Sequence, residues 1–254
     1  MIPYKDENPG ELTPIVTLGI IVVNVLAWLL VQGAGGNAEA LAASVCQLGL
    51  IPGALLRTVP PGTAVPLGAG LHCVLAAAPH WSTVLTSMFM HGGWIHLLGN
   101  MWFLWVFGNN IEDSMGHARF VVFYLVGGVI AALTQMMVAP HSAVPMVGAS
   151  GAISGVMGAY VLLFPRVRVH TLVWLGFFVT TVTLPAYVML GYWFFYQLLL
   201  GTVGALAQVE GGTAFWAHVG GFLAGMALIR PFATQEYLER HRAGVAALIL
   251  PRGV

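Results

Sequence analysis

The side chains best suited to chemistry in this sequence are one serine, three histidines and one asparagine: Ser150, His91, His96, His218 and Asn100. His96 and Asn100 are four residues apart and therefore share one face of a helix. A serine becomes a nucleophile when a base takes its proton, and a neutral histidine can be that base. An amide and a histidine N–H can both donate hydrogen bonds to an oxyanion. These residue types therefore suit hydrolysis through a covalent intermediate on the serine.

No carboxylate accompanies these residues in the sequence. The nearest acidic residues, Glu112 and Asp113, stand at the far end of the helix predicted over 93–111. The pattern therefore favours a Ser–His dyad over a triad. Three histidines could bind zinc, and a zinc-dependent membrane enzyme is an alternative. Because no H-E-x-x-H motif occurs, we predict neither a metal nor a cofactor.

The composition places these residues in a membrane protein. Of 254 residues, 58% are hydrophobic and only 7% are charged, whereas about 25% are charged in an ordinary soluble domain. A membrane-spanning helix needs roughly 20 apolar residues, and several runs of that length carry no charge. This excludes a soluble enzyme and a disordered chain. The zero net charge excludes a nucleic-acid partner, so the lipid bilayer is the expected surroundings.

The uncharged runs predict an all-α membrane protein with six transmembrane helices. These lie at about 15–32, 93–111, 120–137, 149–164, 186–206 and 215–229. The bundle occupies 15–230 and includes an outside loop, 33–80. A short N-terminal segment, 1–14, precedes it, and a tail, 231–254, follows it. Residues 169–183 are expected to form an apolar connector at the membrane interface, which Pro185 separates from the fifth span.

The positive-inside rule supports this count and sets the orientation. With both termini in the cytoplasm, only Arg57 among the basic residues falls outside. The inside segments hold Lys5, Arg119, Arg166, Arg168, Arg230, Arg240, Arg242 and Arg252. We therefore predict a multi-pass protein of the cell membrane. His91, His96, Asn100, Ser150 and His218 then all lie toward the outer face, so the site opens to the extracytoplasmic side.

Other features of the sequence support packing rather than chemistry. Cys46 and Cys73 both fall in the outside loop, where a disulfide and two unpaired thiols are equally compatible with the spacing. Two G-x-x-x-G pairs allow the fourth and sixth spans to approach closely; they are Gly151 with Gly155 and Gly221 with Gly225. The remaining intramembrane amides are expected to bond neighbouring helices; they are Asn24, Gln135, Gln197 and Gln208.

Several separated motifs carry a resemblance to a known family. The nucleophile motif G-x-S-G stands as Gly148-Ala149-Ser150-Gly151, and His218 opens A-H-x-x-G-x-x-x-G with Ala217 before it. The pattern H-x-x-x-x-H-x-x-x-N stands as His91, His96 and Asn100, followed by Gly108, Glu112 and Gly116. Over about 81–230 the sequence resembles the rhomboid intramembrane serine proteases.

The resemblance implies a six-helix rhomboid bundle that cleaves transmembrane-helix substrates near their outer end. Ser150 would be the nucleophile and His218 the general base. The oxyanion hole would comprise His96, Asn100 and the backbone N–H of Ser150. His91 would hold the first loop, and Glu112 would pin that loop's inner end.

Two departures from the family pattern are visible, and other classes remain as alternatives. Trp81 is followed by Ser82 where the family has Trp-Arg, and Ser154 stands where some members have an aromatic residue beside the catalytic histidine. A transporter would be expected to contain repeated halves, and no internal repeat is visible. A non-cleaving rhomboid-like adaptor or chaperone would be expected to lack Ser150 or His218.

Overall fold

A computed structural model describes residues 1–68, 70–75, 77–176, 178–207 and 213–241. A long helix stands at each of the six predicted spans. These helices are α1 (Ile15–Leu26, continued by a π-helical turn Ala27–Val31), α5 (Trp94–Met115), α6 (His117–Val138), α7 (Ser150–Leu163), α8 (Ala186–Leu206) and α9 (Phe215–Phe232). By length and composition, α6 and α8 could each cross a membrane. The full count of six spans stays a prediction.

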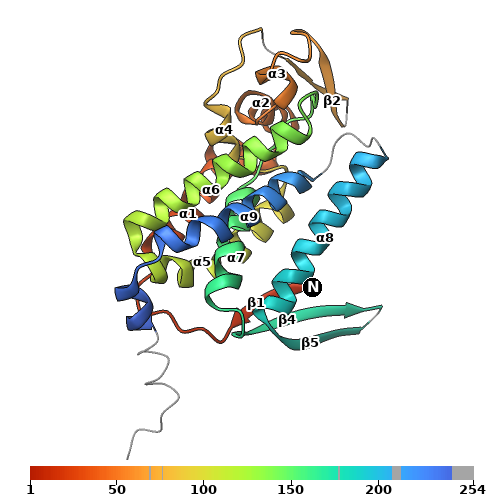
Figure 1. The fold of residues 1–254 in the computed structure, drawn as a ribbon. Coiled ribbons are helices and arrows are strands. Elements are labelled where there is room, and N and C mark those ends of the chain that lie inside the picture. Colours follow the sequence, from red (N-terminus) through yellow and green to blue (C-terminus); the bar gives the residue numbers. More distant parts are fainter. Residues whose placement is uncertain (69, 76, 177, 208–212, 242–254) are drawn as a thin grey trace, which may run out of the picture.

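The shorter elements gather at the two ends of the helix bundle. At one end, Figure 1 shows α2 and α3 close to the β2–β3 ribbon, and at the opposite end β1, β4 and β5 form a sheet. The bounds are β1 (Ile2–Asp6), α2 (Ala38–Leu48), α3 (Pro52–Leu55), β2 (Ala64–Gly68), β3 (Leu71–Val74), α4 (Thr83–Thr86), β4 (Arg168–Leu175) and β5 (Phe178–Pro185), with 3-10 turns at Gly33–Gly35 and Ser87–Phe89.

The prediction of an all-α chain was wrong for three segments, which contain the strands β1, β2–β3 and β4–β5. Residues 169–183 were expected as an apolar connector, but β4 and β5 occupy this stretch as an antiparallel hairpin, and β4 also pairs with β1 in the order β1-β4-β5. β-branched and aromatic residues dominate this stretch and favour strands. Gly176, with φ +63°, supplies the positive φ that a tight turn requires. Residues Ile2–Asp6 of the N-terminal segment therefore form a strand of this sheet, which lies under α8 (Figure 1).

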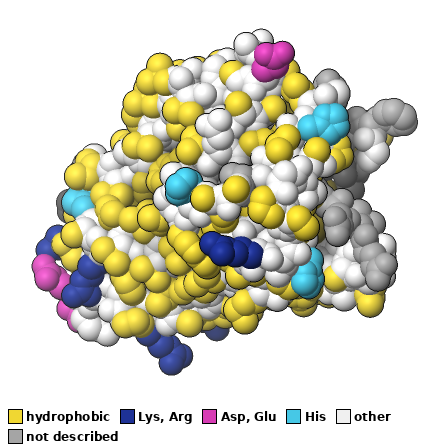
Figure 2. All heavy atoms as spheres, turned by 90° about the horizontal axis from the view of Figure 1, so that it is seen from above, with side chains coloured by type: hydrophobic (Ala, Val, Ile, Leu, Met, Phe, Trp, Pro, Cys, Tyr) yellow, Lys and Arg dark blue, Asp and Glu magenta, His cyan; other side chains and the backbone are white. Residues whose placement is uncertain are grey.

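The described residues of segment 33–80, which was predicted as an outside loop, are folded onto the bundle. Cys46 of α2 and Cys73 of β3 are joined by a disulfide, with Cα atoms 5.5 Å apart. An isolated bridge pairs Leu50 with Met146, which precedes α7. The segment therefore packs directly against the chain that leads to Ser150. Figure 2 shows that hydrophobic side chains cover much of the face seen from this end, with few charges among them.

A buried polar network ties the chain ends to the bundle at the sheet end. The Asp6 carboxylate accepts hydrogen bonds from the Tyr160 hydroxyl, at 2.5 Å, and from Asn110 Nδ2, at 2.9 Å. His241 lies between Asp113 and Asn8, with both distances 2.8 Å. The described part of the tail 231–254 is thus anchored, and residues beyond 241 lie outside the described residues.

Stability should depend on the ionisation of Asp6. Burial raises the pKa of Asp6 from 3.8 to about 6. The folded state therefore binds this proton more tightly than the unfolded state does. The free energy of unfolding should fall by about 2–3 kcal/mol as pH rises from about 4 to above 6. The Asp6→Asn variant has no ionisable group at this position. The melting temperature of the variant minus that of the parent should therefore be larger at pH 7.5 than at pH 4.5. An equal difference at both pH values would contradict the assignment.

Candidate active site

Ser150 and His218 lie within hydrogen-bond distance in the structure. Ser150 is the first residue of α7, and His218 lies in the first turn of α9. The distance from Ser150 Oγ to His218 Nε2 is 2.7 Å. The imidazole is buried, with a relative exposure of 8%. A serine hydroxyl and a buried imidazole at this distance form the pair that nucleophilic catalysis requires.

Gly148 allows the chain to turn into α7 immediately before Ser150. Its φ is +128°, a conformation that L side chains rarely adopt. Its N–H donates to the carbonyl of Ser87 at 2.9 Å, which fixes the turn to the 3-10 segment before α5. Ser150 is thereby placed at a helix N-terminus, whose first N–H groups lack intrahelical acceptors.

The glycine pairs bring α7 and α9 into backbone contact. A Cβ on Gly225 would collide with the carbonyl oxygen of Gly155, and a Cβ on Gly221 would collide with that of Gly151. A Cβ on Gly155 itself would lie 3.3 Å from the Gly221 oxygen. At Gly221 and Gly225 only glycine fits, whereas a Cβ on Gly155 would need its neighbour to shift by a few tenths of an ångström. The separation of Ser150 and His218 therefore depends on glycines one and five residues after Ser150 on α7, and three and seven residues after His218 on α9.

His96 and Asn100 both direct nitrogen atoms toward Gly148, beside the serine. Measured from the position of a Cβ on Gly148, His96 Nε2 is 2.8 Å away and Asn100 Nδ2 is 3.5 Å away. The N–H of Gly92 donates to His96 Nδ1 at 3.2 Å, which leaves the proton on Nε2. Asn100 Nδ2 is buried and has no protein partner within the described ranges. Two N–H donors thus converge where an oxyanion could sit.

His91 is held by the end of the first long helix. Gln32 Nε2 donates to the His91 carbonyl, and the His91 N–H donates to Gln32 Oε1, both at 2.8 Å. The His91 ring is buried against His96, with centroids 5.2 Å apart. Burial and the neighbouring His96 lower the pKa of His91 to about 3, so the ring is neutral near pH 7. Gln32 was not among the predicted residues.

The expectation for Glu112 was wrong. Its carboxylate accepts the N–H groups of Val16 and Thr17 at 2.9 and 2.8 Å, and the Thr17 hydroxyl at 2.7 Å. It therefore caps the N-terminus of α1, where a negative charge is stabilising, and it does not pin the inner end of the first loop. His117 Nδ1 lies 2.6 Å from the same carboxylate.

Two residues of α8 reach His218, and neither was predicted as part of the site. Gln197 Oε1 lies 2.9 Å from His218 Nδ1, and the Trp193 ring centroid lies 5.7 Å from that of His218. Their spacing of four residues places both on one face of α8.

Ser154 stands where some members of the family that the sequence resembles have an aromatic residue, and its hydroxyl donates to the Ser150 carbonyl at 2.6 Å. Of the other amides expected to bond neighbouring helices, Gln135 of α6 accepts the N–H of Ala217 on α9. The expectation was wrong for Asn24, which donates to the Ile20 carbonyl of its own helix. Gln208 lies outside the described residues.

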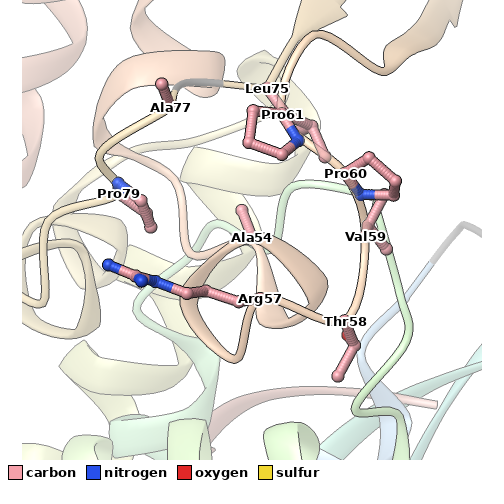
Figure 3. A pocket seen from close by; sticks show the side chains of 9 residues that line it. All are labelled: Ala54, Arg57, Thr58, Val59, Pro60, Pro61, Leu75, Ala77 and Pro79. Atoms are coloured by element: carbon pink, nitrogen blue, oxygen red, sulfur yellow. The ribbon is translucent and has the colours of Figure 1, made fainter.

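A separate surface hollow lies in segment 33–80 rather than at Ser150. Its volume is about 260 Å³. Figure 3 shows Arg57 and three prolines, Pro60, Pro61 and Pro79, among its lining side chains. None of the nine lining residues belongs to the Ser150–His218 site.

The chain belongs to the rhomboid family. The family model described as "Rhomboid domain" matches residues 78–235, more than half of the chain. This range includes every residue of the Ser150–His218 site described above except Gln32. Rhomboid family members are membrane proteins.

Curated relatives carry the family name and come from several sources. The chain is 29% identical to "Rhomboid protease GluP" of Bacillus subtilis (strain 168) over 67% of this chain and 30% of that protein. It is 40% identical to "Rhomboid-like protein 11, chloroplastic" of Arabidopsis thaliana over 34% of this chain and 30% of the relative. It is 37% identical to "Presenilin-associated rhomboid-like protein, mitochondrial" of Mus musculus over 34% of this chain and 24% of that protein. The matched part thus spans less than a third of each of these relatives.

Proposed function

We propose that this protein is an intramembrane serine endopeptidase that cleaves transmembrane-helix substrates through a Ser150–His218 dyad. The observation that carries the proposal is the 2.7 Å distance from Ser150 Oγ to His218 Nε2 at a glycine-enforced helix crossing. Membership of the rhomboid family and a relative named as a rhomboid protease support it. No metal or cofactor is invoked.

The first half of the reaction forms an acyl-enzyme. His218 Nε2 takes the Ser150 proton while Oγ attacks the scissile carbonyl carbon. The carbonyl oxygen becomes an oxyanion, which accepts hydrogen bonds from His96 Nε2, Asn100 Nδ2 and the Ser150 N–H. Loss of one such donor typically costs 10²- to 10³-fold in kcat. The C–N bond then breaks, and His218 returns the proton to the leaving amine.

The second half regenerates the serine. His218 Nε2 takes a proton from water, and the resulting hydroxide attacks the ester carbon of the acyl-enzyme. The same donors bind the second oxyanion. The ester C–O bond breaks, the carboxylic acid product leaves, and His218 returns the proton to Ser150 Oγ. Because both steps need neutral imidazole, activity should fall at acidic pH.

The proposed substrate is a transmembrane helix that unwinds close to its outer end. A helical segment hides its scissile carbonyl in backbone hydrogen bonds, so it must open locally before attack. Glycine and proline lower the cost of opening by roughly 1 and 3 kcal/mol on soluble-helix scales. We therefore expect cleavage in a stretch that contains weak helix formers.

The proposed location is the cell membrane, with six spans, both termini cytoplasmic and the site open to the extracytoplasmic side. The arginine distribution supports this orientation. It puts the disulfide-bonded segment 33–80 outside, where an oxidising compartment would maintain the bond. Two of the relatives are named as chloroplastic and mitochondrial proteins.

The proposal is tested by labelling the detergent-purified protein with a fluorophosphonate probe and mapping the adduct by mass spectrometry. The expected result is an adduct on Ser150, together with cleavage of a transmembrane test substrate. Both should be absent from Ser150→Ala. A folded parent that neither labels nor cleaves, yet retains the test helix in a pull-down, would favour a non-cleaving helix-binding adaptor.

A further inference from the structure

The His218 ring has a hydrogen-bond partner on each of its two nitrogens. Nε2 meets Ser150 Oγ at 2.7 Å, and Nδ1 meets Gln197 Oε1 at 2.9 Å. The three side chains come from three helices, α7, α9 and α8. A Ser–His dyad uses only the first of these contacts. The second is therefore a feature that the proposed reaction leaves unexplained.

The Gln197 contact determines which nitrogen of His218 carries the proton. An amide oxygen can only accept a hydrogen bond, so Nδ1 must donate and must hold the proton of the neutral ring. Nε2 is then left with its lone pair directed at the Ser150 hydroxyl. This is the tautomer that general-base catalysis needs, and in Ser–His–Asp triads a carboxylate imposes it.

Within the described residues, no carboxylate takes that place beside His218. The groups in contact with the ring are Ser150 from α7 and Gln197 and Trp193 from α8. His96 from α5 is a further titratable group that interacts with it electrostatically. A carboxylate here would bring an unpaired charge into a buried site, which is costly. A neutral amide imposes the same tautomer without that charge.

Gln197 is the one polar side chain among the buried residues described on α8. Gln197 is only 7% exposed, whereas the adjacent Phe195 and Tyr196 are 61% and 46% exposed. A polar side chain in a spanning helix is costly and by default suggests a site. Trp193, one turn earlier, packs against the His218 ring from the same face. One face of α8 thus both bonds and packs against the imidazole.

We propose that Gln197 is a positioning residue that completes a Ser150–His218–Gln197 triad. This inference rests on the proposed protease function. When Ser150 Oγ attacks, its proton moves to His218 Nε2. The Nδ1–H of the resulting imidazolium keeps its hydrogen bond to Gln197 Oε1. Gln197 neither gains nor loses a proton.

The test compares kcat, KM and the pH profile of Gln197→Leu and Gln197→Glu with those of the parent. Gln197→Leu should lower kcat about tenfold or more at unchanged KM, since the ring is no longer held in one tautomer. Gln197→Glu supplies a nearly isosteric carboxylate, which favours the imidazolium. The acid limb of its kcat/KM profile should therefore move to higher pH by about one unit.

Asn24→Leu is the matched control, because Asn24 is a fully buried amide that bonds its own helix at Ile20. It should leave kcat and the pH profile unchanged. A Gln197→Leu protein with the kcat of the parent, or a Gln197→Glu protein with an unmoved acid limb, would overturn the inference alone. If the parent itself showed neither fluorophosphonate labelling nor cleavage, the proposed protease function would be overturned, and the triad inference would fall with it.

Discussion

Ser150→Ala and His218→Ala are each expected to lower kcat for peptide cleavage by roughly 10⁴- to 10⁶-fold. Serine hydrolases lose activity on this scale when either group is removed, because nucleophile and base act as one unit. The 2.7 Å distance between Ser150 Oγ and His218 Nε2 makes the same coupling the expectation here. The double variant should therefore be no more than about tenfold slower than either single variant.

The measurement is the cleavage rate of a saturating transmembrane test substrate in detergent, for the two single variants and the double variant. Ser154→Ala is the matched control. Ser154 is buried and lies one turn further along α7, but its hydroxyl donates to the Ser150 carbonyl instead of facing His218. It should keep activity within a few-fold of the parent. Effects of the two single variants that multiply in the double variant would rule out a coupled dyad.

The site could be predicted to the extent that it depends on short, spaced motifs. Ser150 and His218 could be paired because the six-span topology, in which Arg57 is the one basic residue outside, places both at a similar depth in the membrane. His96 and Asn100 followed from their helical spacing. In the structure these four side chains do converge. The family match over 78–235 covers all of them.

The remaining contacts could not be predicted because they depend on the rotation of helices about their own axes. Gln197 is one of several intramembrane amides, and no local pattern distinguishes it from Asn24. Only the packing of α8 on α9 turns it toward His218. Glu112 was misassigned because its partners Val16 and Thr17 are about 95 residues away in sequence, and only the packing of α1 on α5 brings them to its carboxylate. The hairpin β4–β5 was missed because its residues are apolar enough to resemble connector or span.

Gly225→Ala is expected to be among the most destabilising single substitutions in this chain. The added Cβ would meet the carbonyl oxygen of Gly155, which belongs to the backbone of α7 and cannot move aside as a side chain can. α7 and α9 would have to separate, and the close contacts of Gly221 with Gly151 and of Gly158 with Phe222 would open as well. Overpacking usually costs 1–3 kcal/mol, and with a backbone obstacle we expect about 3 kcal/mol or more.

The control for this prediction is Gly191→Ala on α8, where an added Cβ meets nothing within 4 Å. Alanine favours a helix over glycine by about 1 kcal/mol on soluble scales, so this variant should melt at or above the temperature of the parent. Gly225→Ala should melt well below it and should also lose fluorophosphonate labelling, because the spacing of Ser150 and His218 depends on the same crossing. Labelling that survives at full rate in a Gly225→Ala protein would show that the helix crossing does not set the geometry of the dyad.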